Sequence, residues 1–147
     1  MRSVLSIDGG GIRGIIPALV LDYLERESGR PISDLFDLVV GTSSGGIIAL
    51  GLAQADADQR PKFSANDLAA FFEKSGRTIF EKTLWRNIRS AGGVLDELYS
   101  ARPLEVVLRK YFSNTQLGET LGSTMVTAYD IEDRRTLFLK SWHPDHE

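Results

Sequence analysis

Residues 41–45, Gly-Thr-Ser-Ser-Gly, have the spacing Gly-x-Ser-x-Gly, which is typical of a serine on a sharp turn between a strand and a helix. Such a turn gives its central serine strained backbone angles and an exposed hydroxyl. Small residues two positions to either side let the strand and the helix close together, and the helix N-terminus favours developing negative charge. The motif predicts a nucleophile at Ser43, in a turn formed with Gly41, Thr42, Ser44 and Gly45. The alternative is that the two serines only cap a helix.

A second motif, Asp-Gly-Gly-Gly-Ile-Arg-Gly, occupies residues 8–14. Consecutive glycines expose backbone N–H groups with no side chains in the way, which is how an oxyanion hole is built. An arginine beside these N–H groups either adds to their positive electrostatic field or holds the loop in place. The motif predicts an oxyanion-binding loop that contains Gly9, Gly10, Gly11, Arg13 and Gly14. The alternative is a plain flexible loop.

The same glycines also satisfy the dinucleotide-binding pattern, Gly9-x-Gly11-x-x-Gly14. A nucleotide-binding module therefore remains a rival interpretation. It requires an acidic residue at the end of the second strand to hold the ribose hydroxyls. That strand ends instead in glycine, threonine and serine, and Asp34 and Asp37 lie before it or at its start, so the pattern is only half matched.

Each motif follows a short apolar segment and precedes an apolar helical pattern. Residues 3–7 and 37–40 are the expected strands. The first helix has an apolar face with helical spacing from residue 16 to residue 24, and Gly29 and Pro31 end it. Two strand–turn–helix units in succession predict an α/β fold with a parallel sheet, and both turns should lie at the carboxyl ends of the strands.

The rest of the chain continues the α/β pattern. Ser64 and Asp67 form a capping-box pattern before a helix with apolar residues at 68, 71, 72 and 79. Another helix is expected from Pro103, followed by strands at residues 124–129 and 136–142 with a polar turn between them. Residues 82–94 look irregular, and Trp85 within them is expected to pack on the core rather than to face lipid.

Composition excludes several classes of protein. The 147 residues contain no cysteine, which removes disulfides, thiolate metal sites and cysteine nucleophiles. The net charge of −3 gives no sign of a nucleic-acid partner, and the only histidines, His143 and His146, lie in the tail. No metal or cofactor is expected. The sequence shows no apolar run of the roughly 20 residues that a membrane span needs and no typical signal peptide, so we expect a cytoplasmic protein.

The paired motifs at residues 8–14 and 41–45 resemble those of the patatin-like phospholipases. The likeness extends to residues 5–8, 36–41, 103–105 and 126–130, and covers most of the chain. The resemblance implies a three-layer α/β/α fold with a mainly parallel sheet, and cofactor-free hydrolysis of acyl esters in membrane phospholipids or other lipids by a peripherally bound protein. It implies that Ser43 is the nucleophile, that Gly10 and Gly11 donate to the oxyanion beside Arg13, and that an aspartate, without histidine, is the base.

That aspartate belongs to a downstream Asp-Gly-Gly or Asp-Gly-Ala motif, and the only Asp-Gly pair here is Asp8-Gly9. We therefore expect residues 1–147 to be the N-terminal part of a single patatin-like domain. Asp130 is a candidate substitute, although a structural role is favoured for it. A serine–aspartate–histidine order through Asp133 and a tail histidine is formally possible. A further alternative is a catalytically inactive, truncated interaction domain.

Overall fold

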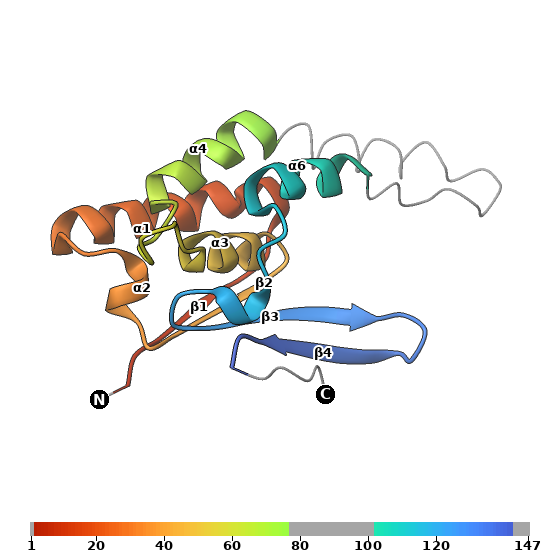
Figure 1. Ribbon diagram of the computed structural model, residues 1–147. Coiled ribbons are helices and arrows are strands. Elements are labelled where there is room, and N and C mark those ends of the chain that lie inside the picture. Colours follow the sequence, from red (N-terminus) through yellow and green to blue (C-terminus); the bar gives the residue numbers. More distant parts are fainter. Residues whose placement is uncertain (1, 77–101, 143–147) are drawn as a thin grey trace.

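The computed structural model describes residues 2–76 and 102–142. Its N-terminal part runs β1 (Val4–Ile7), η1 (Gly11–Gly14), α1 (Ile15–Ser28), α2 (Ile32–Leu35), β2 (Leu38–Thr42), α3 (Ser44–Ala53) and α4 (Ala65–Gly76). The later part contains α6 (Arg102–Phe112), η3 (Leu117–Glu119), β3 (Ser123–Asp130) and β4 (Arg135–Lys140). Figure 1 shows these elements along the chain.

The strands form one sheet in the order β1-β2-β3-β4. β1 pairs with β2 and β2 with β3 in parallel, whereas β3 and β4 form an antiparallel hairpin. Ile7 lies opposite Gly41, and Gly41 lies opposite Val126, so the carboxyl ends of β1 and β2 meet at one edge of the sheet. The predicted α/β class with a mainly parallel sheet is confirmed, and both glycine motifs begin at this edge.

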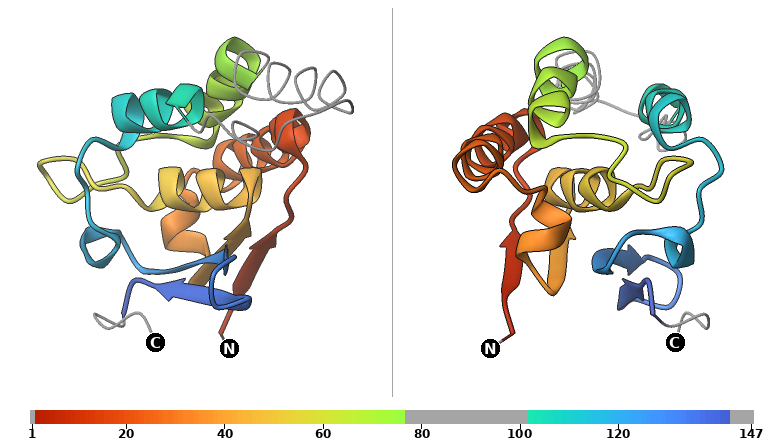
Figure 2. Two further views of the ribbon diagram at one scale, coloured as in Figure 1. Left: turned by 90° about the vertical axis from the view of Figure 1, so that its right-hand side faces the viewer. Right: turned by 60° about the vertical axis from the view of Figure 1, so that its left-hand side comes forward.

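The helices of the described residues cover one face of the sheet (Figures 1 and 2). α3 packs directly on β2 and β3, while α1 and α4 pack on each other. The core lies between the helices and the sheet. It is formed mainly by aliphatic side chains and two phenylalanines, including Ile7, Leu21, Ile48, Leu52, Leu68, Phe71 and Phe72. On the opposite side of the sheet, Val4 is 59% exposed and Phe138 is 51% exposed. The described residues therefore show two layers, and the third layer of the expected α/β/α arrangement stays a prediction.

Several local predictions are confirmed at the helix ends. Gly29 ends α1 in the left-handed region, with φ of 65°, where a glycine carries no steric penalty. The capping box before α4 is formed, because the Asp67 carboxylate accepts the Ser64 N–H at 2.9 Å and the Asp67 N–H donates to the Ser64 hydroxyl at 3.2 Å. β4 ends at Lys140, two residues before the predicted limit of 142. Trp85 lies outside the described residues.

The turn between β3 and β4 depends on Asp130. Its Oδ1 accepts the N–H groups of Glu132 at 3.0 Å and Asp133 at 3.1 Å. Arg134 supplies the positive φ, 53°, that a glycine would otherwise provide. The carboxylate thus stabilises loop backbone, which is the structural role that the sequence favoured.

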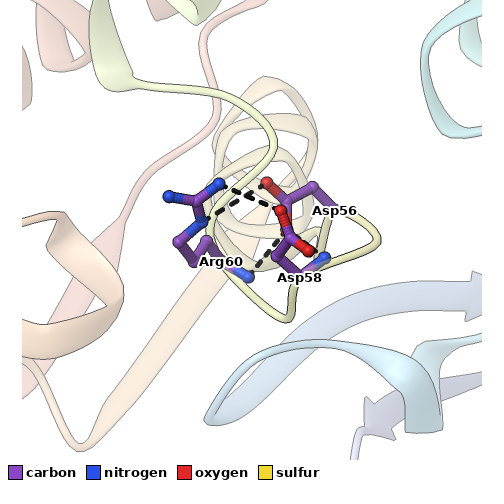
Figure 3. A network of polar contacts seen from close by, with 3 residues as sticks. All are labelled: Asp56, Asp58 and Arg60. Atoms are coloured by element: carbon purple, nitrogen blue, oxygen red, sulfur yellow. Dashed lines mark hydrogen bonds and ion pairs between the residues drawn. The ribbon is translucent and has the colours of Figure 1, made fainter.

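The polar loop between α3 and α4 is organised in the same way around Asp56 (Figure 3). Its Oδ1 accepts the N–H groups of Asp58 and Arg60, both at 2.9 Å, and the Arg60 guanidinium pairs with Asp58 at 3.1 Å. The hydrogen bond from the Arg60 N–H, more than any other contact, holds the pKa of Asp56 below its ordinary value of 3.8. These side chains hold the backbone of the connecting loop in place.

One carboxylate joins two helix starts. Glu25 Oε1 accepts the N–H of Ile32, the first residue of α2, at 3.1 Å. Glu25 Oε2 accepts the N–H of Ala65, the first residue of α4, at 2.8 Å. The first N–H groups of a helix have no partner within it, and a negative charge there is favourable.

Glu25→Ala should therefore destabilise the fold by about 2 kcal/mol, because charge-assisted hydrogen bonds to a half-exposed carboxylate contribute roughly that much together. Urea denaturation followed by circular dichroism would measure the change. Glu27→Ala, an exposed position on the same helix, should change the free energy of unfolding by less than about 0.5 kcal/mol. Equal effects of the two substitutions would contradict this role of Glu25.

A second carboxylate fastens β1 to the start of β2. The Ser3 N–H donates to Asp37 Oδ2 at 2.6 Å and the Ser3 hydroxyl donates to the same oxygen at 3.0 Å. These bonds, the backbone one first, lower the pKa of Asp37 from its ordinary value of 3.8. A lowered pKa in the folded state means that this contact stabilises the fold above the unfolded-state pKa and is lost as pH falls through the folded-state pKa.

Asp37→Asn should accordingly lower the stability at neutral pH and have little effect in strong acid. The measurement is the free energy of unfolding of both proteins at a series of pH values from 7 down to about 2. We expect the difference to be constant above about pH 4.5 and to shrink below the ordinary aspartate pKa. A difference that is the same at every pH would show that the Asp37 charge makes no contribution.

Candidate active site

The turn at residues 41–45 holds its central serine in an unusual backbone conformation. Ser43 has φ of 54° and ψ of −123°, and α3 begins at the next residue. A Cβ on Gly41 would lie 2.2 Å from the Gly45 carbonyl oxygen, and a Cβ on Gly45 would lie 2.1 Å from the Ile7 carbonyl oxygen. Neither position can accept a side chain. The strand, turn and helix therefore have the geometry that the Gly-x-Ser-x-Gly spacing predicts, with an exposed serine at the bend.

The glycine loop of residues 8–14 lies directly against this serine. A Cβ on Gly9 would lie 2.7 Å from Ser43 Cβ, 3.0 Å from the Thr42 carbonyl oxygen and 3.5 Å from Ser43 Oγ. The structure thus brings together two motifs that are far apart in the sequence. It also gives a reason for glycine at position 9, because any side chain there would collide with the turn.

The backbone N–H groups of this loop have different surroundings. The Gly10 N–H donates to the Ser44 hydroxyl at 3.0 Å, and Ser44 is only 1% exposed. Gly11 has φ of 60° and begins η1, so the Gly11 and Ile12 N–H groups lie in a first helical turn, where no acceptor exists within the helix. The family resemblance implies that Gly10 and Gly11 both donate to the oxyanion, whereas in the structure the Gly10 N–H is bonded to a buried hydroxyl.

Arg13 folds back onto its own loop. Its Nε donates to the Gly10 carbonyl at 3.4 Å, and its backbone N–H donates to the same oxygen at 3.2 Å. This arrangement favours the interpretation that Arg13 holds the loop in place. Gly14 serves close packing, since a Cβ there would lie 2.8 Å from the Phe72 ring of α4 and 3.2 Å from Ser44 Cβ.

The neighbouring strand contributes a contact that the sequence did not indicate. Thr127 Oγ1 in β3 donates to Thr42 Oγ1 at 2.9 Å, next to the bend. The two hydroxyls tie the carboxyl end of β2 to β3. Nothing in a local pattern marks Thr127 for this role, because it requires knowing that β3 lies beside β2.

A hollow of about 450 Å³ adjoins the glycine loop between β1 and α1. Asp8, Gly9, Gly10 and Arg13 line its polar part, and Ile16, Pro17 and Val20 of α1 line its apolar part. Ser43 itself is not part of the lining. The hollow nevertheless places exposed apolar side chains beside the loop that lies against the serine.

The candidate bases are not brought to Ser43. Within residues 2–76 and 102–142, no hydrogen bond joins Ser43 Oγ to a carboxylate. Asp130 is committed to its turn, and Asp133 pairs with Arg135 at 3.6 Å. His143 and His146 lie outside the described residues. The described residues thus place an exposed serine hydroxyl against a glycine loop, and the base of the expected dyad is not among the groups that they bring together.

The described part of the chain does not fit a metal site or a dinucleotide site. No group of three or more His, Cys, Asp or Glu side chains there is placed to hold a metal ion. For a dinucleotide, the acidic residue at the end of β2 is missing, because that strand ends at Thr42 and Asp37 bonds Ser3 at the other end. Among these residues, none of the helices has both the length and the apolar character to cross a bilayer.

Comparison with known proteins agrees with the paired motifs. The profile of the patatin-like phospholipase family matches residues 5–144. Patatin-like protein 2 of Oryza sativa subsp. indica is 37% identical over 150 aligned positions, which cover 95% of this chain and 37% of that protein. Patatin-2-Kuras 4 of Solanum tuberosum is 32% identical over 149 positions, covering 96% of this chain and 38% of that protein. The chain therefore spans well under half the length of these relatives, and it belongs to the patatin-like phospholipase family.

Proposed function

We propose that this chain carries the nucleophile and the oxyanion loop of a serine acyl hydrolase that acts on phospholipids or other acyl lipids. The observation that supports this most is the position of Ser43. It lies at a bend with positive φ, 54°, and its Oγ is 3.5 Å from where a Gly9 Cβ would stand. A hydroxyl held against a loop of bare amides is the arrangement that acyl transfer requires.

In the proposed reaction, Ser43 Oγ attacks the carbonyl carbon of the ester as its proton passes to a carboxylate base. The carbonyl oxygen becomes an oxyanion, and N–H groups of the glycine loop, with Gly11 foremost, hold the developing charge. The alcohol of the lipid leaves with the proton from the base. A water molecule then releases the fatty acid from Ser43. The family resemblance assigns the base to an aspartate in an Asp-Gly-Gly or Asp-Gly-Ala motif, which these 147 residues do not contain.

The surroundings of the loop suit an apolar substrate. Ile16 and Val20 are exposed on α1 and line the hollow beside Gly9 and Gly10. Apolar side chains next to polar amides match an acyl ester, which has a hydrocarbon chain on one side of its carbonyl. We propose that the acyl chain enters from this side, with the protein bound peripherally to the lipid surface.

Ser43→Ala in the full-length protein should abolish labelling by a fluorophosphonate probe and lower lipase activity by roughly 10³-fold or more, because it removes the attacking atom. Labelling is read by mass spectrometry of the peptide that contains residue 43. Ser28→Ala, an exposed serine at the end of α1, is the matched control and should change neither quantity. Labelling of the Ser43→Ala protein would refute the assignment, and an unlabelled wild-type protein would favour an inactive interaction domain.

Gly9→Ala should impair the same reaction without unfolding the chain. The new methyl would lie 2.7 Å from Ser43 Cβ, so the loop must shift away from the nucleophile. Displacing oxyanion donors typically costs roughly 10²–10³-fold in rate, and we expect the labelling rate constant to fall by about that factor. Gly118→Ala is the control, because its nearest neighbour would be 3.9 Å away. Unchanged labelling with Gly9→Ala would show that the loop takes no part.

A further inference from the structure

Ser44 joins the two motifs by a direct hydrogen bond. It is the first residue of α3, next to Ser43 in the chain, and its side chain is 1% exposed. Its Oγ accepts the Gly10 N–H at 3.0 Å. Because Gly10 and Ser44 come from separate strand–helix units, the bond fixes the loop relative to the turn. The Gly-x-Ser-x-Gly pattern leaves this position unspecified, so the pattern itself assigns it no role.

The loop needs such a restraint. Three consecutive glycines have more conformational freedom than any other residues, so an ordered loop costs more entropy here than elsewhere. The bonds of Arg13 to the Gly10 carbonyl lie within the loop and do not fasten it to the turn. In the described part of the chain, the side-chain hydrogen bond that joins the loop to α3 is the one from the Gly10 N–H to Ser44 Oγ.

We infer that Ser44 is a positioning residue for the reaction proposed above. By accepting the Gly10 N–H, its hydroxyl sets the loop against Ser43, so that the following N–H groups, beginning with Gly11, are the ones left for the oxyanion. Ser44 touches no substrate atom and moves no proton. The inference depends on the proposed function for its effect on rate, whereas the Gly10–Ser44 restraint can be tested independently of it.

The test compares Ser44→Ala with the wild-type full-length protein. Hydrogen–deuterium exchange of peptides covering residues 8–14 reports on the restraint. The second-order rate constant for fluorophosphonate labelling, with kcat and KM, reports on its effect. Thr124→Val is the matched control, because Thr124 is also fully buried, on β3, and its Oγ1 has no hydrogen-bond partner in the described part of the chain. Ser44→Thr retains the acceptor and tests for rescue.

We expect Ser44→Ala to speed exchange in the loop and to lower the labelling rate constant and kcat by roughly 10- to 100-fold, with KM nearly unchanged and the pH profile unmoved. Titration of Ser44→Ala with the fluorophosphonate should give one reactive site per molecule, as in the wild type. If Ser44 had a merely structural role, fewer molecules would react, and each reactive site would keep the wild-type rate. Thr124→Val should match the wild type, and Ser44→Thr should recover most of the rate.

If residues 8–14 exchanged hydrogen for deuterium at the same rate in Ser44→Ala as in the wild type, the restraint would be overturned. If Ser44→Ala exchanged faster in the loop but kept the wild-type labelling rate per reactive site, the positioning role would be overturned. It would also be overturned if Ser44→Thr protected the loop from exchange but labelled as slowly as Ser44→Ala. Failure of the proposed function gives a different pattern, in which Ser43→Ala still labels or the wild type does not. In that case the exchange of the loop in Ser44→Ala still decides whether Ser44 holds it.

Discussion

The close approach of three backbone segments determines the geometry of the whole site. The end of β1, the end of β2 and the first turn of α3 meet with no room for side chains, since Cβ atoms at Gly41 and Gly45 would lie 2.2 Å and 2.1 Å from backbone oxygens. This contact forces the chain to reverse within the turn, and Ser43 takes the positive φ that the reversal requires. It also brings Gly9, just past the end of β1, against the serine. The strain at Ser43 is sustained by the packing of α3 on β2 and β3.

The site that results has two halves with different physical demands. The turn is rigid because its neighbours leave it one conformation, and it presents a hydroxyl. The loop is intrinsically the most flexible segment near it, and it presents amides. Arg13 closes the loop on itself, and Ser44 connects the loop to the turn. The chain belongs to the patatin-like phospholipase family, and this membership supports the proposal that the pairing serves lipid acyl hydrolysis. The carboxylate of the expected dyad is not among the described groups that meet there.

The features predictable from sequence are those that nearby residues determine. The two strand–turn–helix units, the left-handed Gly29, the capping box at Ser64 and the turn at Ser43 all follow from local spacing, and each is present. The contacts that the sequence did not reveal join distant segments. Thr127 meets Thr42 because β3 lies beside β2, and Gly10 bonds Ser44 because two loops share one edge of the sheet. No periodicity encodes such pairs. The short helix α2 was also missed, since four residues are too few to show a helical pattern.

Glu25 has a consequence for how the molecule moves. Its two carboxylate oxygens hold the first turns of α2 and α4, which are remote from each other in the chain. A shift of α1 at Glu25 would disturb both hydrogen bonds, so one side chain couples the starts of the two helices. They should then behave as one cooperative opening unit with α1. Since Gly14 packs against Phe72 of α4, a movement of α4 would be felt by the glycine loop, which links the Glu25 anchor to the loop beside Ser43.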